Sequence, residues 1–202
     1  MKPHFKKDRT FVIIKPDGIQ RSLIGEIIKR YERPGLKLVG VKMLIPTAEK
    51  IRKHYTVDSG WLRKVGEKNI KSYELKGKKA PINDPVKMGE KVLEVLIKYM
   101  TSGPVIAMVW QGAHAVQIVK KITGSTEPLT SAVGTIRGDF VLDSYEMSDT
   151  DARAVRNVLH VSTSQEEAEA EINIWFDKKE LINYCLVQEA ILYDVNLDGI
   201  IE

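Results

Sequence analysis

The order of its apolar segments constrains the fold of this chain more than any other feature. Residues 10–14 form a continuous apolar, β-branched run that predicts a buried strand, and Lys-Pro-Asp-Gly at 15–18 predicts a turn directly after it. Three more strands are predicted at 36–44, at 105–110 and around His160. Helical spacing of apolar residues predicts helices at 24–31, 47–55, 84–100, 113–122 and 164–176.

Without its extra helices, this order is β-α-β-β-α-β. It predicts an α+β, ferredoxin-like fold, in which an antiparallel sheet carries two helices on one face. A chain of 202 residues with 43% hydrophobic and 29% charged residues suits one domain spanning 1–202. We expect a long irregular connection between Gly124 and Asp151 and a C-terminal tail of short segments at about 185–202.

The sequence also indicates the cellular compartment. A single cysteine, Cys185, allows no internal disulfide, which points to a reducing environment. No apolar run approaches the roughly 18 residues that cross a membrane, and the basic start of the chain is not followed by a signal-type apolar segment. We therefore expect a cytoplasmic protein that is not bound to a membrane.

Charge is unevenly distributed along the chain. The net charge is +4, residues 61–79 hold seven Lys or Arg against two Glu, and no Lys or Arg follows Glu180. A solvated basic surface is the simpler interpretation, and a single-stranded nucleic-acid site is the alternative. The predicted sheet has few aromatic residues beyond Phe11 and Trp110, so nucleic acid is not an expected partner.

The stretch from Arg156 to Ser162 carries the chemistry that we consider first. It predicts a short strand that delivers the imidazole of His160, and a neutral imidazole can attack phosphorus. Ser164 and Glu167 have capping-box spacing, so a helix beginning there would place Glu171 about two turns in, where it could orient the imidazole. A purely structural histidine is the alternative.

Several cationic and hydroxyl side chains would surround this imidazole if the predicted strand ends and the 124–138 loop met. Such a cage suits phosphoryl transfer, which needs positioning and stabilisation of negative charge. Simpler interpretations exist: Lys15 could be a solvated turn lysine, Asn157 a strand-end cap, and Arg137 the partner of Asp139 in an ion pair. The members are Lys15, Lys120, Thr126, Arg137 and Asn157.

Six sequence blocks, in order along the chain, resemble the nucleoside diphosphate kinase family. They are Thr-Phe-Val-Ile-Ile-Lys-Pro-Asp-Gly at 10–18, Gly-Glu-Ile-Ile-Lys-Arg at 25–30, Lys-His-Tyr at 53–55, Ser-Gly-Pro-Val-Ile-Ala-Met-Val at 102–109, Gly-Thr-Ile-Arg-Gly-Asp at 134–139 and Arg-Asn-Val-Leu-His at 156–160. Six blocks in family order are far more specific than any one of them.

The resemblance implies a ping-pong exchange. The γ-phosphate of a nucleoside triphosphate would move to His160 and then to a nucleoside diphosphate, with Mg²⁺ held mainly by the nucleotide phosphates. By position, Glu171 and Ser162 match the groups that orient the histidine and its phosphate, and Tyr55 matches a nearby tyrosine. The resemblance assigns phosphate or sugar contacts to Lys15, Lys120, Thr126, Arg137 and Asn157. It also implies a homo-oligomer, a hexamer or a smaller even assembly, built partly by the loop at 126–128.

The chain departs from the family pattern in several places. Lys120 replaces an arginine, Val161 a small residue and Thr163 an acid. An insertion at about 58–91, which we expect to be helical, removes the stretch whose aromatic residue stacks on the base. Leu96 falls on an apolar base contact; Trp61 could replace the lost aromatic or could belong to the core. The departures leave open a protein that binds nucleotide without turnover.

Overall fold

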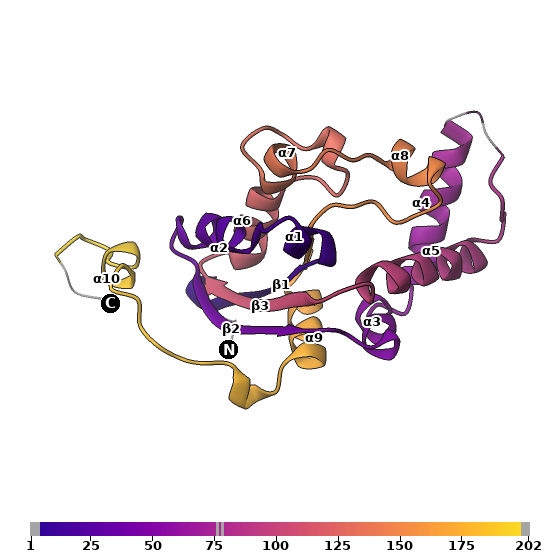
Figure 1. Cartoon of the computed structure of the whole chain (residues 1–202). Helices are drawn as coiled ribbons and strands as arrows, with labels where there is room; N and C mark the ends of the chain where they lie inside the picture. The colour runs from indigo at the N-terminus through magenta and orange to yellow at the C-terminus, as the bar shows by residue number, and fades with distance from the viewer. Residues whose placement is uncertain (1–4, 76, 78, 199–202) are drawn as a thin grey trace.

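A four-stranded antiparallel sheet forms the centre of the molecule (Figure 1). In this computed structural model, which describes residues 5–75, 77 and 79–198, the strands lie in the order β2-β3-β1-β4. Their bounds are Asp8–Ile14 for β1, Lys37–Leu44 for β2, Val105–Gly112 for β3 and Leu159–Val161 for β4. The predicted ferredoxin-like fold is confirmed. The ends of the expected domain and tail, 1–4 and 199–202, lie outside the described residues.

Helices cover both faces of the sheet. The two helices of the β-α-β-β-α-β order, α2 (Ile24–Glu32) and α6 (Ala115–Thr123), share one face as expected. The other face, which the prediction left uncovered, packs against α3 (Ala48–Tyr55), α5 (Pro85–Met100) and α9 (Gln165–Trp175). Burial on both faces explains why the run at 11–14 is apolar without alternation.

Short helices replace the turn and part of the irregular connection that we predicted. The Lys-Pro-Asp-Gly stretch begins α1 (Pro16–Gln20), because a proline at the first helical position is preorganised for a helix. The connection contains a 3₁₀ turn at Pro128–Thr130, α7 (Ile136–Phe140) and α8 (Tyr145–Thr150). The hydroxyls of Thr135 and Ser144 cap α7 and α8.

The insertion forms a helix that packs closely on α5. This helix, α4 (Trp61–Leu75), projects with α5 at the right of Figure 1. The two helices meet at glycines: a Cβ at Gly66 would lie 1.8 Å from the Pro85 carbonyl oxygen, and one at Gly89 would lie 2.0 Å from that of Leu62. Only glycine permits this approach.

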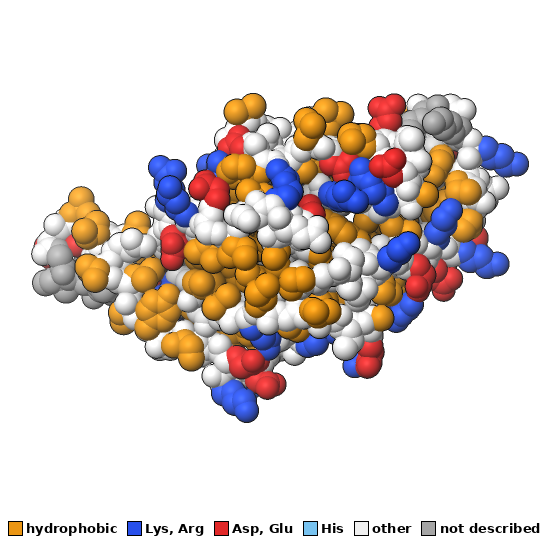
Figure 2. Space-filling view, viewed as in Figure 1, with side chains coloured by type: hydrophobic (Ala, Val, Ile, Leu, Met, Phe, Trp, Pro, Cys, Tyr) orange, Lys and Arg blue, Asp and Glu red, His pale blue; other side chains and the backbone are white. Residues whose placement is uncertain are grey.

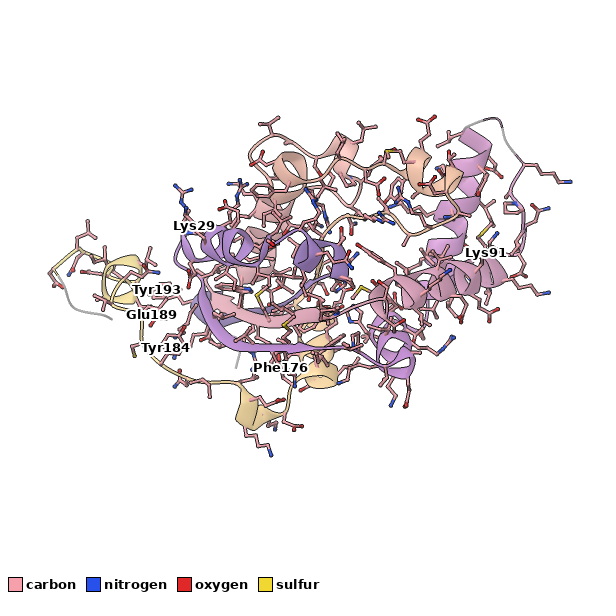
Figure 3. The ribbon with its side chains drawn as sticks, viewed as in Figure 1. Lys29, Lys91, Phe176, Tyr184, Glu189 and Tyr193 are labelled. Atoms are coloured by element: carbon pink, nitrogen blue, oxygen red, sulfur yellow. The ribbon has the colours of Figure 1, made fainter. Side chains whose placement is uncertain are left out.

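The C-terminal segment returns to the outer edge of β2. The backbone amide of Ile182 donates to the Val39 carbonyl at 2.8 Å; a 3₁₀ turn at Lys178–Glu180 precedes this contact and α10 (Glu189–Leu192) follows it. Figure 3 shows Tyr184, Glu189 and Tyr193 on this tail. The Lys37 ammonium donates to the Tyr184 carbonyl and the Glu189 carboxylate at 2.7 and 2.9 Å. A 3₁₀ turn, Phe5–Lys7, precedes β1.

The described helices include none that is long and apolar enough to span a bilayer.

Candidate functional site

The end of β1 and the strand β4 bring the candidate residues together. His160 lies opposite Ile13 in the β1–β4 ladder, and Lys15 follows β1 directly. The backbone amide of Lys15 donates to the Val158 carbonyl at 2.8 Å, which continues the pairing beyond β4. Two segments that are far apart in the sequence therefore present a lysine and a histidine at one place.

His160 is held by a carboxylate from α9. Its Nε2 lies 2.6 Å from Glu171 Oε1, and Glu171 Oε2 accepts a 2.5 Å hydrogen bond from the Ser162 hydroxyl. Ser164 caps α9 as predicted, by accepting from the Glu167 amide. Burial raises the pKa of Glu171 to about 7, whereas burial and then the charge of Lys15 lower the pKa of His160 to about 3. The imidazole is therefore neutral near pH 7.

A second histidine, which the sequence analysis did not single out, shares the same carboxylate. His54 Nδ1 lies 3.3 Å from Glu171 Oε1, and the rings of His54 and His160 are 4.3 Å apart. His54 is buried on α3, and the spacing of three from Ile51 places both on the buried side of that helix. That spacing could have identified His54 as buried, but its contact with Glu171 depends on how α3 packs against α9.

Lys15 is held in place by Asn157. Its Nζ donates to Asn157 Oδ1 at 2.7 Å, and Asn157 Nδ2 donates to the Thr126 carbonyl at 2.8 Å. Burial, followed by the neighbouring charge of Arg137, lowers the pKa of Lys15 to about 7. Lys15 is only 5% exposed, so it is not the solvated turn lysine that we considered as an alternative. The Thr126 side chain is exposed beside this group.

Arg137 braces the backbone around the site. Its guanidinium donates to four carbonyl oxygens, at distances of 2.7 to 3.1 Å, which belong to Gly124, Ser125, Asn157 and Leu159. In place of the ion pair with Asp139 that we considered, Asp139 pairs with Arg30 at 2.7 Å. Because most of its donors are bound to carbonyl oxygens, Arg137 can offer a phosphate mainly its positive charge.

The remaining candidates lie around this centre at different depths. Tyr55 ends α3 with its ring centroid 6.1 Å from that of His160. Trp61 begins α4, packs on the Tyr55 ring at a centroid distance of 5.4 Å and also contacts the core, and Leu96 lies half-buried on α5. Lys120 is exposed on α6 and lines a cavity of about 490 Å³ with Lys121 and Gly124. Gly124 and Ser125, whose carbonyls accept hydrogen bonds from Arg137, line the same cavity.

Two further residues support the backbone that precedes His160. The Asp17 carboxylate accepts from the Val158 amide at 3.2 Å and from the Tyr99 hydroxyl at 2.5 Å. Asp17 lies within the Lys-Pro-Asp-Gly block and Tyr99 within the apolar stripe of α5. Neither position indicates this contact in the sequence, because the two residues are joined only when α5 packs beside α1.

The donor set of the site suits an anion better than a metal ion. The ammonium of Lys15 and the guanidinium of Arg137 supply positive charge, and the carboxylates of Asp17 and Glu171 already accept hydrogen bonds on both oxygens. Mg²⁺ prefers free oxygen ligands, so here it would have to be held mainly by a bound polyphosphate. The arrangement can bind a phosphate chain and present a neutral imidazole to it.

Comparison with known proteins gives a consistent result. The sequence model of a family described as nucleoside diphosphate kinase matches residues 8–62 and 68–181. A nucleoside diphosphate kinase from Pyrobaculum aerophilum is 42% identical over 179 residues, which cover 87% of this chain and 98% of that protein. The human nucleoside diphosphate kinase A is 37% identical and covers 93% of this chain and 97% of its own length.

Solved structures agree with the sequence relatives. The crystal structure of an NDP kinase from Pyrobaculum aerophilum superposes with a TM-score of 0.84 at 40% identity, covering 88% of this chain and all (100%) of that one. A nucleoside-diphosphate kinase from Borrelia burgdorferi, described as a transition state mimic with bound vanadate and ADP, gives 0.76 at 34% identity and covers 93% and 98% of the two chains.

Proposed function

The chain belongs to the nucleoside diphosphate kinase family and is a phosphotransferase that acts on nucleotides, and from this we propose a ping-pong mechanism through a phosphohistidine on His160. In this mechanism the γ-phosphate of a nucleoside triphosphate passes to the histidine and then to a nucleoside diphosphate.

One observation carries the proposal: Glu171 is hydrogen-bonded to one ring nitrogen of His160, and the other ring nitrogen is available to react. Nε2 is bound to Glu171 Oε1 at 2.6 Å, and Nδ1 has no hydrogen-bond partner within the described part of the chain. Glu171 thereby fixes the tautomer that carries its proton on Nε2. The lone pair of Nδ1 is then available to attack phosphorus.

The two half-reactions follow from this geometry. Nδ1 attacks the γ-phosphorus, the bond from that phosphorus to the β–γ bridging oxygen breaks, and the nucleoside diphosphate leaves with the electron pair. A terminal β-phosphate oxygen of a second nucleoside diphosphate then attacks the phosphohistidine, and the P–N bond breaks to restore His160. The proton on Nε2 stays beside the Glu171 carboxylate, which stabilises the positive charge on the ring during both steps.

Lys15 and Asn157 would bind the transferred phosphoryl group, and the positive charge of Arg137 would stabilise it from the backbone carbonyls that Arg137 binds. Stabilisation of the equatorial oxygens by fixed cations is the main contribution a protein makes to this chemistry. We assign to Thr126 and the exposed Lys120 contacts with the nucleotide phosphates that are not transferred. Tyr55 would lie beside the His160 imidazole. Leu96 and Trp61 border the same region, on α5 and α4, where a base could lie against an apolar surface.

Mg²⁺ would be held by the nucleotide phosphates and would neutralise charge on the leaving group. The free carboxylate oxygens that a protein-held Mg²⁺ needs are already committed at Asp17 and Glu171. In the relative from Borrelia burgdorferi, vanadate and ADP are bound together, which supports a site for a nucleotide and a transferred phosphoryl group.

The intact mass of the protein after brief incubation with ATP and Mg²⁺ tests the proposal. We expect wild type to gain one acid-labile phosphoryl group that added GDP removes, and a chelator to prevent the gain. His160→Ala should not gain it, whereas His114→Asn, which changes a histidine at the start of α6, should behave as wild type. Nucleotide binding without any gain of mass in wild type would show a binding protein instead.

We also propose a cytoplasmic homo-oligomer, a hexamer or a smaller even assembly. Hydrophobic side chains gather across the middle of the face shown in Figure 2. On β2, the side chains of Val41 and Met43 are 53% and 58% exposed. Leu129, Val133 and Leu142 are also exposed in the segment that follows α6. Apolar exposure on this scale is typical of protein interfaces. Light scattering behind a sizing column would give the mass of the assembly.

A further inference from the structure

The backbone turn just before His160 holds an unusual conformation. Val158 has a φ of +55°, a left-handed value that is a genuine outlier for a β-branched residue. The Leu159 amide donates to the Asn157 carbonyl at 2.6 Å and closes a three-residue turn around Val158. Such conformations persist only where the surrounding structure holds them in place.

Contacts from the Lys-Pro-Asp-Gly segment hold this turn. The Val158 carbonyl accepts from the Lys15 amide at 2.8 Å, and the Val158 amide donates to Asp17 Oδ2 at 3.2 Å. Gly18 lies against the same residue, because a Cβ there would be 3.2 Å from the Val158 carbonyl oxygen. Both backbone polar groups of Val158 therefore have partners in the Lys-Pro-Asp-Gly segment, at Lys15 before α1 and at Asp17 in its first turn.

Tyr99 in turn holds Asp17. Its hydroxyl donates to Asp17 Oδ1 at 2.5 Å, and burial raises the pKa of Tyr99, so that the hydroxyl keeps its proton. Asp17 is 9% exposed and has one oxygen for each partner. Tyr99 lies near the C-terminal end of α5, so this helix positions the hydroxyl that holds Asp17.

The turn sets the direction of two functional side chains. β4 has only three residues, and His160 is the second of them. A strand this short has little pairing of its own to fix its register, and a shift of one residue would send the imidazole to the opposite face of the sheet. Asn157, on the other side of the turn, holds the Lys15 ammonium at 2.7 Å.

We infer that Asp17, supported by Tyr99, is a positioning residue that holds the Asn157–Leu159 turn in its left-handed conformation and thereby aims His160 and Asn157 at the phosphoryl group. This inference rests on the proposed role of His160. It predicts that loss of the Asp17 contact slows phosphoryl transfer more than it weakens nucleotide binding, since displacement of a reacting group by about 1 Å can cost roughly 100-fold in rate.

The test is the single-turnover rate of phosphoenzyme formation at saturating ATP, measured with the nucleotide Kd. Asp17→Asn replaces one accepting carboxylate oxygen with an amide nitrogen, which cannot accept from the Val158 amide or the Tyr99 hydroxyl. We expect phosphoenzyme formation to become about 10- to 100-fold slower, with little change in the nucleotide Kd. The same substitution is then combined with Val158→Gly and, separately, with Val158→Ala. Glycine adopts positive φ freely and alanine does not. Asp17→Asn should therefore cost far less in the Val158→Gly background than in the Val158→Ala background.

Tyr99→Phe provides a second variant in case the changes at Val158 prevent folding. We expect it to slow transfer in the same direction. Its control is Tyr31→Phe, which also removes a buried tyrosine hydrogen bond, here to the Thr123 hydroxyl at 2.6 Å, and should leave the rate unchanged.

The possible outcomes separate the two proposals. The positioning role would be overturned if Asp17→Asn lowered the rate of phosphoenzyme formation by the same factor in the Val158→Gly and Val158→Ala backgrounds. It would also be overturned if Tyr99→Phe and Tyr31→Phe formed the phosphoenzyme at the same rate. If wild type itself forms no phosphoenzyme, the proposed function fails first. The positioning role would then be judged by hydrogen exchange of the Leu159 amide, which should become faster in Asp17→Asn but not in Asp17→Asn with Val158→Gly.

Discussion

At the scale of single residues, the environment of Glu171 gives the site its chemical character. The carboxylate is 1% exposed, yet it contacts His160, His54 and Ser162 together. Burial raises the pKa of Glu171 to about 7, so the group is half ionised at neutral pH. The ionised form is the stronger acceptor for the Nε2 proton of His160, because a hydrogen bond to a charged oxygen is about twice as strong as one to a neutral oxygen.

We expect phosphoenzyme formation to depend on the ionisation of Glu171. Its pKa is raised, so the carboxylate is protonated below about pH 7, and the rate should fall as pH decreases through that value. Glu171→Gln should lower the rate about 10-fold near pH 7.5, since a charge-assisted hydrogen bond is lost. Single-turnover rates between about pH 5.5 and 8 check this expectation. The fall in rate towards acidic pH should be present in wild type and absent in Glu171→Gln. As pH rises, the loss of charge on Lys15, whose pKa is also about 7, acts in the opposite direction and should remain in both proteins.

The same pH series includes its own control. Glu169, two residues earlier on α9, pairs with Arg9 on the surface, and Glu169→Gln should retain the wild-type pH profile. An acidic limb that persists unchanged in Glu171→Gln would assign it to another group.

At the scale of elements, the close contact of α4 with α5 determines the shape of the insertion. Gly66 and Gly89 let the two helices approach until the carbonyl oxygens of one lie where a Cβ of the other would be. The basic residues of α4 are exposed to solvent. The helix therefore owes its position to small residues at its contact rather than to charge.

Gly66→Ala should reduce the free energy of unfolding by about 1–3 kcal/mol, because the added methyl group overlaps the Pro85 carbonyl and must separate the helices. Gly25→Ala is the matched control. It lies in α2 with nothing within 4 Å of its Cβ position, so it should be neutral or stabilise by up to about 1 kcal/mol. Chemical denaturation measures both, and a similar loss in the two variants would mean that the helix contact is looser than it is in the structure.

At the scale of the whole molecule, the C-terminal tail closes over one edge of the sheet. Lys37 is buried on β2, and its charge is balanced by Glu189 at 2.9 Å, on a segment that starts beyond the ferredoxin-like core. Lys42 pairs with Glu180 nearby, but this pair is about one-third exposed, with side-chain exposures of 29% and 36%. Buried and exposed ion pairs thus join the same tail to the same strand.

Glu189→Gln should loosen the tail far more than Glu180→Gln. The first leaves the buried Lys37 ammonium without an opposite charge, which costs about 3 kcal/mol or more when a pair is fully buried and somewhat less here. The second removes a pair that solvent screens, so its loss should matter little. Limited proteolysis followed by mass spectrometry should show that the tail beyond Glu180 is cleaved sooner than in wild type in Glu189→Gln only. Equal cleavage of the tail in both variants would contradict the prediction.

The sequence by itself determined the features that depend on local pattern. The apolar run at 11–14, the helical spacing in α2, α5 and α6, and the cap at Ser164 are local properties, and the structure confirms the elements that they predicted. The short helices α1, α7 and α8 were missed. Each has only five or six residues, too few for a periodic pattern, and each depends on a proline or on a capping hydroxyl.

Only the tertiary structure decided which groups meet. His54 reaches Glu171 because α3 packs against α9, and Tyr99 reaches Asp17 because α5 lies beside α1. The commitment of Arg137 to four carbonyls likewise depends on how the segment after α6 folds back over the turn before β4. Sequence pattern records the period of one segment, whereas these contacts depend on distances between segments, which packing alone sets.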